Sequence, residues 1–406
     1  MLKRTQGAME KFSDNPIPAT QKATFIGAST YQKKVGSVYS ANHPLAIPRV
    51  ALTLDVINAY GALTAAEYKL ARKAADYELE WFHTSDYISA IKRAEVLGCV
   101  KSEVRKRYNL GTLENPYFAG LFSVPATATG GSILAAEEVL QGRIGFNPAG
   151  GMHHARAASA QGFSYFNDPV LGIMRLRRAG LRVLYVDIDA HHGDGVELAF
   201  ADDPEVLTLS LHMDTSYAYP FLGGTLDDCG TPQNGYTAIN VPLPKGVHDA
   251  EYRLVFDAVW SAALNKFKPD AVVLQSGTDM LAADPLGKFS ISTQCYLEMC
   301  AAIMQSAPRH PDGTPRLLVT GGGGYHPLLL ARAWAGLWAL LSGRTLPAEM
   351  PAQGARLLRE VGWELDEDEA YFENLFVSRL DEIQTLPVRP DIERLIEQLQ
   401  RHPFLQ

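Results

Sequence analysis

The sequence has few cysteines and no long apolar run, and each shortage excludes a class of protein. Its four cysteines, Cys99, Cys229, Cys295 and Cys300, form no CxxC pair, which argues against a structural zinc knuckle and against a disulfide framework. No stretch approaches the ~20 consecutive apolar residues that span a membrane, and residues 1–16 lack the apolar run of a signal peptide. We therefore expect a soluble, cytoplasmic protein.

An excess of positive charge is also missing. The net charge of −8 and the pI of about 5.8 argue against a protein that holds nucleic acid by neutralising phosphates. A cationic peptide or amine is an easier partner. The chain has no internal repeat and no low-complexity linker, which favours one continuous domain. No pattern indicates the oligomeric state.

Apolar runs of strand length alternate with segments of helical spacing. The expected strands are 183–188, 206–211, 271–276 and 316–320, and the expected helices are 169–180, 249–267, 293–307 and 327–341. This alternation predicts an α/β fold with a central, mostly parallel sheet that helices cover on both faces. We expect a catalytic domain over residues 1–345, with the acidic residues 346–406 as a helical extension packed on it.

One expected strand ends in a cluster of charged residues, VLYVDIDAHHGDG at residues 183–195. In an open parallel sheet, ligands bind in the crevice outside the carboxyl ends of the strands. Asp187, Asp189, His191 and Asp194 therefore lie at the edge where chemistry is expected. Helix capping by one aspartate and plain packing of one histidine are the alternative, but so many polar residues favour metal binding or acid–base catalysis.

Three further polar loops adjoin expected strands. GTDMLAADPLG places Asp279 and Asp284 after one strand, and GGGGYHP places Tyr325 after another. GGMHHARAASAQGFSYFND places the adjacent His153 and His154 in a loop bracketed by glycines. Each loop alone has a simpler explanation, such as a phosphate nest for GGGG or a turn for the two aspartates. Their convergence on one crevice predicts an active site.

Together these motifs resemble the zinc-dependent histone deacetylase superfamily, which has an arginase-like fold. GGMHHA, GFSYFND, DIDAHHGDG, LSLH, GTDMLAADPLG and GGGGY occur in the order and spacing of that family, from about Tyr39 to Trp338. The likeness is greatest to the bacterial branch that includes acetoin-utilisation-type deacetylases. DIDAHHGDG is the most specific of these motifs, and GGGG is the least.

The resemblance implies two cation sites. Asp189, His191 and Asp279 match the family's metal ligands, and three oxygen and nitrogen ligands with an open position are typical of catalytic zinc. Iron(II) or cobalt(II) fits the same ligands. A monovalent cation, expected to be K+, is implied at Ser210 and at the backbone around Asp187, Asp189, His191 and Leu211.

The resemblance also implies the residues that move protons and stabilise charge. His153 and His154 match tandem histidines that deprotonate the attacking water and protonate the leaving amine. Asp187 is expected to accept from His153, and Asp194 from His154, although helix capping stays open for both carboxylates. Tyr325 matches a tyrosine that polarises the substrate carbonyl, and the glycines before it are expected to give that ring clearance.

The remaining matches lie along the channel expected for an acyl-lysine stem. Gly162 and Phe163 match one wall and Tyr219 is expected to supply the other, while ordinary core packing stays open for Phe163. Arg49 matches an arginine near the acetate exit. Glu114 lies near the position of a rim aspartate that holds the substrate backbone.

Three features depart from the family pattern and bear on the substrate. SYAYPFLGGTLDDCG lacks the Pro-Gly-Thr-Gly of many relatives, Ser164 stands where many have Cys, and His326 stands where many have Asn. We expect the loop and His326 to alter the mouth or the floor of the site.

The prediction is a metal-dependent amidohydrolase that uses metal-activated water to remove acetyl, or a similar small acyl group, from a lysine ε-amine. An acetylpolyamine amidohydrolase is the alternative within the same chemistry. A non-catalytic acyl-lysine binder is the alternative from another class. A guanidine hydrolase with two manganese ions fits less well, because it needs additional bridging aspartates.

Overall fold

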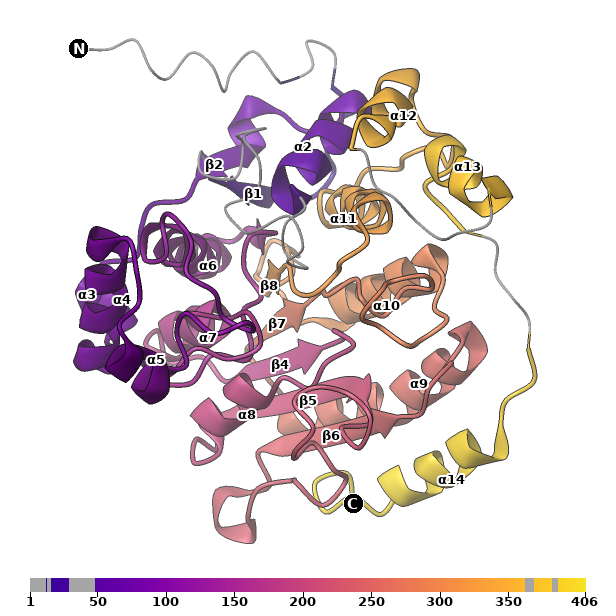
Figure 1. Cartoon of the computed structure of the whole chain (residues 1–406). Helices are drawn as coiled ribbons and strands as arrows, with labels where there is room; N and C mark the ends of the chain where they lie inside the picture. Colours follow the sequence, from indigo (N-terminus) through magenta and orange to yellow (C-terminus); the bar gives the residue numbers. More distant parts are fainter. Residues whose placement is uncertain (1–11, 13–15, 29–47, 362–368, 382–385) are drawn as a thin grey trace, which may run out of the picture.

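The computed structural model describes residues 12, 16–28, 48–361, 369–381 and 386–406. They form a central sheet surrounded by helices (Figure 1). Three predictions fall wholly or partly outside these ranges. They concern residues 1–16, the start of the family resemblance near Tyr39, and parts of the expected C-terminal extension.

The sheet has eight strands in the order β2-β1-β3-β8-β7-β4-β5-β6, and every neighbouring pair is parallel. The strands are β1 Ala23–Gly27, β2 Tyr68–Leu70, β3 Ile144–Asn147, β4 Val183–Asp187, β5 Val206–Met213, β6 Ala238–Leu243, β7 Ala271–Gln275 and β8 Leu317–Thr320. The expected α/β fold with a parallel sheet is therefore confirmed.

Helices cover both faces of the sheet (Figure 1). The helices are α2 Arg49–Ala59, α3 Asp76–Leu79, α4 Ser85–Leu97, α5 Ser102–Tyr108, α6 Ser123–Leu140, α7 Asp168–Arg177, α8 Asp194–Phe200, α9 Asp249–Phe267, α10 Thr293–Ser306, α11 Pro327–Leu341, α12 Ala352–Arg359, α13 Glu369–Val377 and α14 Pro390–Leu399. Helices α6, α7 and α8 pack on one face, and α9, α10 and α11 on the other.

Strand β4 has apolar side chains on both faces, which explains why helices cover both faces of the sheet. Val183 and Tyr185 face the core under α6 to α8, whereas Leu184 and Val186 face the core under α9 to α11. All of these side chains are buried, as expected of a parallel strand between two helical layers. Each such side chain contributes about 1.5–3 kcal/mol of burial free energy. The strand is thereby fixed, and so is the position at which it ends.

The crevice for ligands lies at the carboxyl ends of β4 and β7. From β4 the chain continues to β5 on one side of the sheet, and from β7 it continues to β8 on the other side. The direction in which the chain adds strands to the sheet therefore reverses between β4 and β7, which are direct neighbours. A doubly wound sheet binds its ligand at such a switch point. The residues that follow these two strands are therefore the ones placed for chemistry.

Parts of the expected C-terminal extension contact the main sheet domain. Helix α12 packs against α2, and α14 packs against α9. The guanidinium of Arg389 donates to both carboxylate oxygens of Glu251 on α9, at 2.7 and 2.8 Å. The division of the chain at residue 345 stays a prediction.

All four cysteines are free thiols, and only Cys99 is exposed. Among the residues that the structure describes, no helix combines the length and the apolarity needed to cross a membrane.

Candidate active site

A group of three buried side chains lies at the switch point of the sheet. Asp189 and His191 follow β4, and Asp279 follows β7. Their ligand atoms all lie within 4.8 Å of one another, and the His191 Nδ1 atom is 2.8 Å from Asp279 Oδ2. The structure thus brings together the three residues that the sequence predicted as metal ligands.

Backbone amides fix both carboxylates of this group. The amide of Ala190 donates to Asp279 Oδ1 at 2.9 Å, and the amide of Gly323 donates to Asp189 Oδ2 at 2.6 Å. The amide of His191 donates to Asp189 Oδ1 at 3.0 Å. Hydrogen bonds of this kind orient ligand carboxylates in metal sites. The group is therefore held in place by three separate loops.

The electrostatics of the group fit a divalent cation. Burial, together with the charge of Asp189, raises the pKa of Asp279 to about 7. Burial opposes protonation of His191, but hydrogen bonds with Asp189 and Asp279 raise the pKa of this imidazole to about 10. Two buried carboxylates therefore demand a positive charge between them. Two oxygen ligands and one nitrogen ligand are the donor set of a catalytic zinc site, and iron(II) or cobalt(II) suits them too.

The glycine loop 321–324 passes directly against these carboxylates. A Cβ atom on Gly323 would lie 2.1 Å from Asp279 Oδ2, and one on Gly324, where φ is +131°, would lie 2.1 Å from Thr278 Oγ1. Both contacts are too short for any side chain. The glycines are thus required by close approach to the metal-ligand group, whereas the sequence suggested clearance for Tyr325.

Two histidine–aspartate pairs adjoin the group. His153 Nδ1 is 2.8 Å from Asp187 Oδ2, and His154 Nδ1 is 2.7 Å from Asp194 Oδ1. The two Nε2 atoms face each other at 3.0 Å. Helix capping by Asp194 is not observed, because the N-cap of α8 is Gly193 and no side chain caps it. Both carboxylates contact the imidazoles as the family resemblance implied.

Second partners of these carboxylates were missed in the sequence. The hydroxyl of Tyr185 donates to Asp187 Oδ2 at 2.6 Å, and the guanidinium of Arg156 pairs with Asp194. Tyr185 is two residues before Asp187 on β4, and side chains two residues apart on a strand point to the same face. This spacing could have predicted that the two side chains meet. Arg156 lies in an irregular loop, where no periodic pattern points to its partner.

The two imidazoles have opposite electrostatic environments. Burial opposes protonation of His153, but the carboxylates of Asp187 and Asp189 outweigh burial and raise the pKa of His153 to about 9. Burial and the neighbouring charge of His153 lower the pKa of His154 to about 4. Near neutral pH, His153 is therefore a cation and His154 a neutral base.

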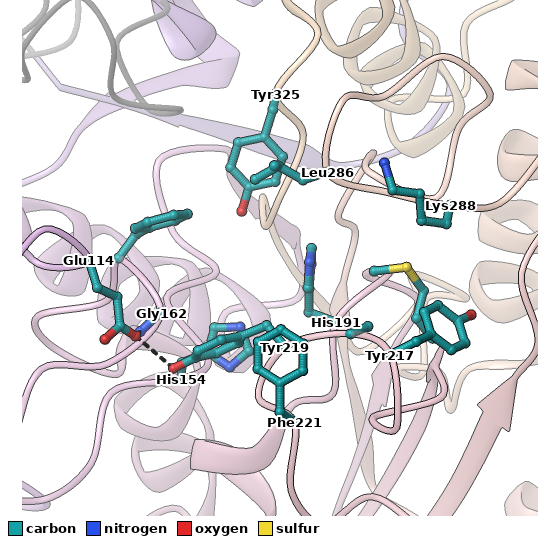
Figure 2. A pocket seen from close by; sticks show the side chains of 13 residues that line it. Glu114, His154, Gly162, His191, Tyr217, Tyr219, Phe221, Leu286, Lys288 and Tyr325 are labelled. Atoms are coloured by element: carbon teal, nitrogen blue, oxygen red, sulfur yellow. Dashed lines mark hydrogen bonds between the residues drawn. The ribbon is translucent and has the colours of Figure 1, made fainter.

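Tyr325 closes the site from the other side. Its amide donates to Asp284 Oδ2 at 2.8 Å, and its ring lies edge-on to the rings of Phe163 and His191. Burial raises the pKa of its phenol, which keeps the hydroxyl protonated and able to donate. Figure 2 shows this hydroxyl pointing into the pocket.

The outer pocket is lined by aromatic side chains and by Glu114 (Figure 2). Glu114 Oε1 accepts from the Gly162 amide at 2.5 Å and from the Tyr219 hydroxyl at 2.8 Å. The Tyr219 ring lies edge-on to His154 at 4.8 Å, and Phe163 lines the same pocket. The expected channel residues therefore come together, although the role of Glu114 toward a substrate stays a prediction. Sequence reasoning assigned no role to six lining residues: Met213, Tyr217, Ala218, Phe221, Leu286 and Lys288.

Arg49 lines a smaller inner cavity behind the histidines. Its guanidinium donates to the Gly322 carbonyl at 2.6 Å and lies over the Trp334 ring. Ser164 lines this cavity as well. His326 was expected to alter the mouth or floor, but it lines neither pocket; its side chain caps the start of α11 by accepting from Leu329.

The residues expected to hold K+ lie beneath the metal-ligand group. Ser210 of β5 is the partner of Asp187 across the sheet, and the Ser210 hydroxyl accepts from the Gly193 amide at 3.4 Å. Leu211 follows on the same strand and is buried. Binding of a monovalent cation there stays a prediction.

Fold and site together define a hydrolase with a buried group suited to a metal. A model of the histone deacetylase domain matches residues 43–341. Histone deacetylase 8 of Xenopus tropicalis is 37% identical over 306 residues, which cover 75% of this chain and 80% of that protein. The yeast (Saccharomyces cerevisiae) histone deacetylase RPD3 is 38% identical over 327 residues, 79% of this chain and 73% of RPD3.

Solved structures agree with these relatives. The crystal structure of an HDAC homologue from Aquifex aeolicus has a TM-score of 0.87 and 38% identity, and the match covers 94% of this chain and 100% of that one. An HDAC homologue in complex with SAHA gives the same TM-score and coverage at 37% identity. The chain therefore belongs to the histone deacetylase family and is a deacetylase-type hydrolase.

Removal of one ligand carboxylate is expected to abolish metal retention. In Asp189→Ala or Asp279→Ala, only two of three protein ligands remain, so tight binding and turnover are lost together. Metal stoichiometry after dialysis, measured beside turnover, tests this expectation. Asp257→Ala, an exposed position on α9, is the control and should keep its metal. Stoichiometric metal at unchanged affinity in both variants would refute the ligand assignment.

Proposed function

We propose that this protein hydrolyses N-ε-acetyl-lysine, or a lysine with a similarly small acyl group, to free lysine and the acid. The observation that supports this most directly is the meeting of three groups at the base of one aromatic channel. These are the Asp189–His191–Asp279 group, the His154–Asp194 pair and the Tyr325 hydroxyl. Each supplies a different requirement of amide hydrolysis.

Amide hydrolysis needs an activated water, a base and an acid. A divalent cation held by Asp189, His191 and Asp279, with zinc as the first candidate, would polarise the substrate carbonyl and activate the attacking water. His154 is buried, neutral and oriented by Asp194, so it is suited to accept a proton from that water. The same imidazole, once protonated, can donate to the nitrogen of the leaving amine. Expulsion of an amine as an anion is thereby avoided.

His153 has a supporting part in this scheme. The carboxylates of Asp187 and Asp189 raise the pKa of its imidazole, which favours the protonated form over the neutral form that a base requires. Its positive charge lies between Asp187 and the metal-ligand carboxylates. There it offsets negative charge and holds His154 in the neutral form. We assign His153 an electrostatic role and His154 the proton transfer.

Tyr325 stabilises the oxyanion in this proposal. As water attacks, the carbonyl oxygen gains charge, and a protonated phenol that points into the pocket is a suitable donor. The channel formed by Phe163 and Tyr219 suits an aliphatic lysine stem because aromatic faces exclude water along its length. Arg49, in the inner cavity, is placed to attract the acetate product.

Two further assignments belong to this proposal. A potassium ion bound at Ser210 and the adjacent backbone would stabilise the loop that presents Asp189 and His191. A cytoplasmic setting is supported by the four free thiols, which suit a reducing compartment.

Release of amine from a fluorogenic acetyl-lysine peptide tests the reaction as a whole. We expect turnover by the metal-loaded protein, its loss with a chelator, and its return when zinc, iron(II) or cobalt(II) is added back. The activity recovered with each added metal ion shows which metal supports turnover. A protein that binds the peptide but releases no amine at any metal loading would be an acyl-lysine binder, contrary to the proposal.

Tyr325→Phe is expected to lower kcat by roughly a hundred- to a thousand-fold, the usual cost of deleting one oxyanion donor. The ring is retained, so metal content and thermal midpoint should stay near those of the parent. KM should change little, because the hydrogen bond strengthens as charge develops. Tyr77→Phe, at an exposed tyrosine remote from the pocket, is the matched control. A kcat within a few-fold of the parent would remove Tyr325 from the mechanism.

His154→Ala is expected to be more damaging than His153→Ala. Loss of a general acid–base group typically costs about 10²–10⁴ in rate, whereas loss of an electrostatic neighbour costs less. Kinetics of both variants at matched metal content give the comparison. Equal, mild losses would argue against the division of roles between the two imidazoles.

A further inference from the structure

Two lysines that have no carboxylate partner among the described residues lie at or beside one side of the outer pocket. Lys288 lines the pocket on the side opposite Glu114 (Figure 2). Its exposed ammonium donates to the Pro285 carbonyl at 3.1 Å, and in the described part of the chain it forms no ion pair. Lys245 places its ammonium 4.7 Å from the centre of the Tyr217 ring, and Tyr217 also lines the pocket.

A backbone hydrogen bond brings these two lysines together. The amide of Gly246, the residue after Lys245, donates to the carbonyl of Lys288 at 2.7 Å. The loop before α9 and the loop after β7 are thus joined at the pocket edge. Two ammonium groups on adjacent loops create a local positive potential there.

The carboxylate across the pocket is already engaged. Glu114 accepts from the Gly162 amide, the Tyr219 hydroxyl and the side-chain amide of Asn109. These three donors stabilise its negative charge and leave it less available to a substrate cation. In the described part of the chain, the least compensated charge at the pocket mouth is therefore the positive charge of Lys288, with Lys245 beside it.

The opposing wall of the mouth is apolar and exposed. Phe221 lines the pocket and is 67% exposed, and the adjacent Leu222 is 82% exposed. A substrate chain that crosses the mouth would therefore meet a hydrophobic surface on one side and ammonium groups on the other. A polyamine could contact the hydrophobic surface through its methylene groups, but its remaining nitrogens are cations and would be repelled by the ammonium groups.

We propose that Lys288 and Lys245 form a subsite for an acidic side chain, so that the substrate is an acyl-lysine within a peptide that carries Asp or Glu beside it. This inference rests on the proposed deacetylation and adds the substrate class. Acetylated polyamines are disfavoured, because their second ammonium would face Lys288. The net charge of −8 favours cationic partners at long range, but salt screens that field beyond ~10 Å and leaves the local contact to decide.

Matched peptides test the subsite. One series has acetyl-lysine flanked at successive positions by Asp, Asn or Lys, and acetylputrescine and acetylspermidine are assayed beside it. For the parent protein we expect kcat/KM to fall in the order Asp, Asn, Lys, by roughly three- to five-fold per step at the responsive position, mainly through KM. Added salt should compress these differences. The polyamines should be poorer substrates than the Asn peptide.

A second experiment reverses the charge of one lysine of the subsite. Lys288→Glu should invert the order of the Asp and Lys peptides in kcat/KM. Lys268→Glu is the matched control and should leave the order unchanged. Lys268 is exposed and precedes β7, so it lies at the amino edge of the sheet, away from the pocket.

The possible failures are distinguishable. Equal kcat/KM for the Asp and Lys peptides, or an unchanged ratio in Lys288→Glu, would overturn the subsite while deacetylation stands. Acetylated polyamines that surpass every peptide would also overturn it. If no substrate is turned over, the proposed function fails; fluorescence anisotropy of labelled peptides then gives the same charge comparison for binding, and an absent Asp preference there also rejects the subsite.

Discussion

The crowding of carboxylates at the ends of β4 and β7 is the constraint on which the rest of the site depends. Asp187, Asp189 and Asp279 are all buried within a few residues of adjacent strands. Uncompensated, such a set would be costly, because buried like charges repel strongly. The fold compensates with backbone amides from neighbouring loops and with imidazoles that accept protons. A divalent cation would complete that compensation, so the group fits a metal for the same electrostatic reason that its carboxylates need partners.

The difference between the two adjacent histidines arises from this field. His153 lies nearest the carboxylates and takes a positive charge, and that charge then suppresses protonation of His154. Two identical side chains at neighbouring positions thus differ by several pKa units without any specialised residue. The positions of the carboxylates, fixed by the ends of two strands, therefore decide which imidazole has the raised pKa and which the lowered pKa.

The sequence predicted the parts that follow from regular periodicity. β4, β5, β7 and β8 are apolar runs, and the polar residues after β4 and β7 met as expected. Four strands, β1, β2, β3 and β6, were not predicted. In β3 the sequence IGFN contains glycine and asparagine, and β2 is a three-residue edge strand with no buried residue. The pocket mouth was only partly predicted. Residues such as Tyr217 and Lys288 lie in irregular loops, where contacts depend on tertiary hydrogen bonds that no local pattern encodes.

Reaction and selection are controlled by different parts of the chain. The base of the pocket is built from strand ends and glycine loops that approach the carboxylates too closely to accept side chains. One side of the mouth is built from the loops that follow β5 and β7, where Phe221 and Lys288 are exposed. Substitutions at the mouth change which chain can enter without moving the ligand carboxylates. A family that shares one reaction can therefore diversify in substrate by changing these loops. In the described part of this chain, the loops present two ammonium groups that form no ion pair, opposite an apolar wall.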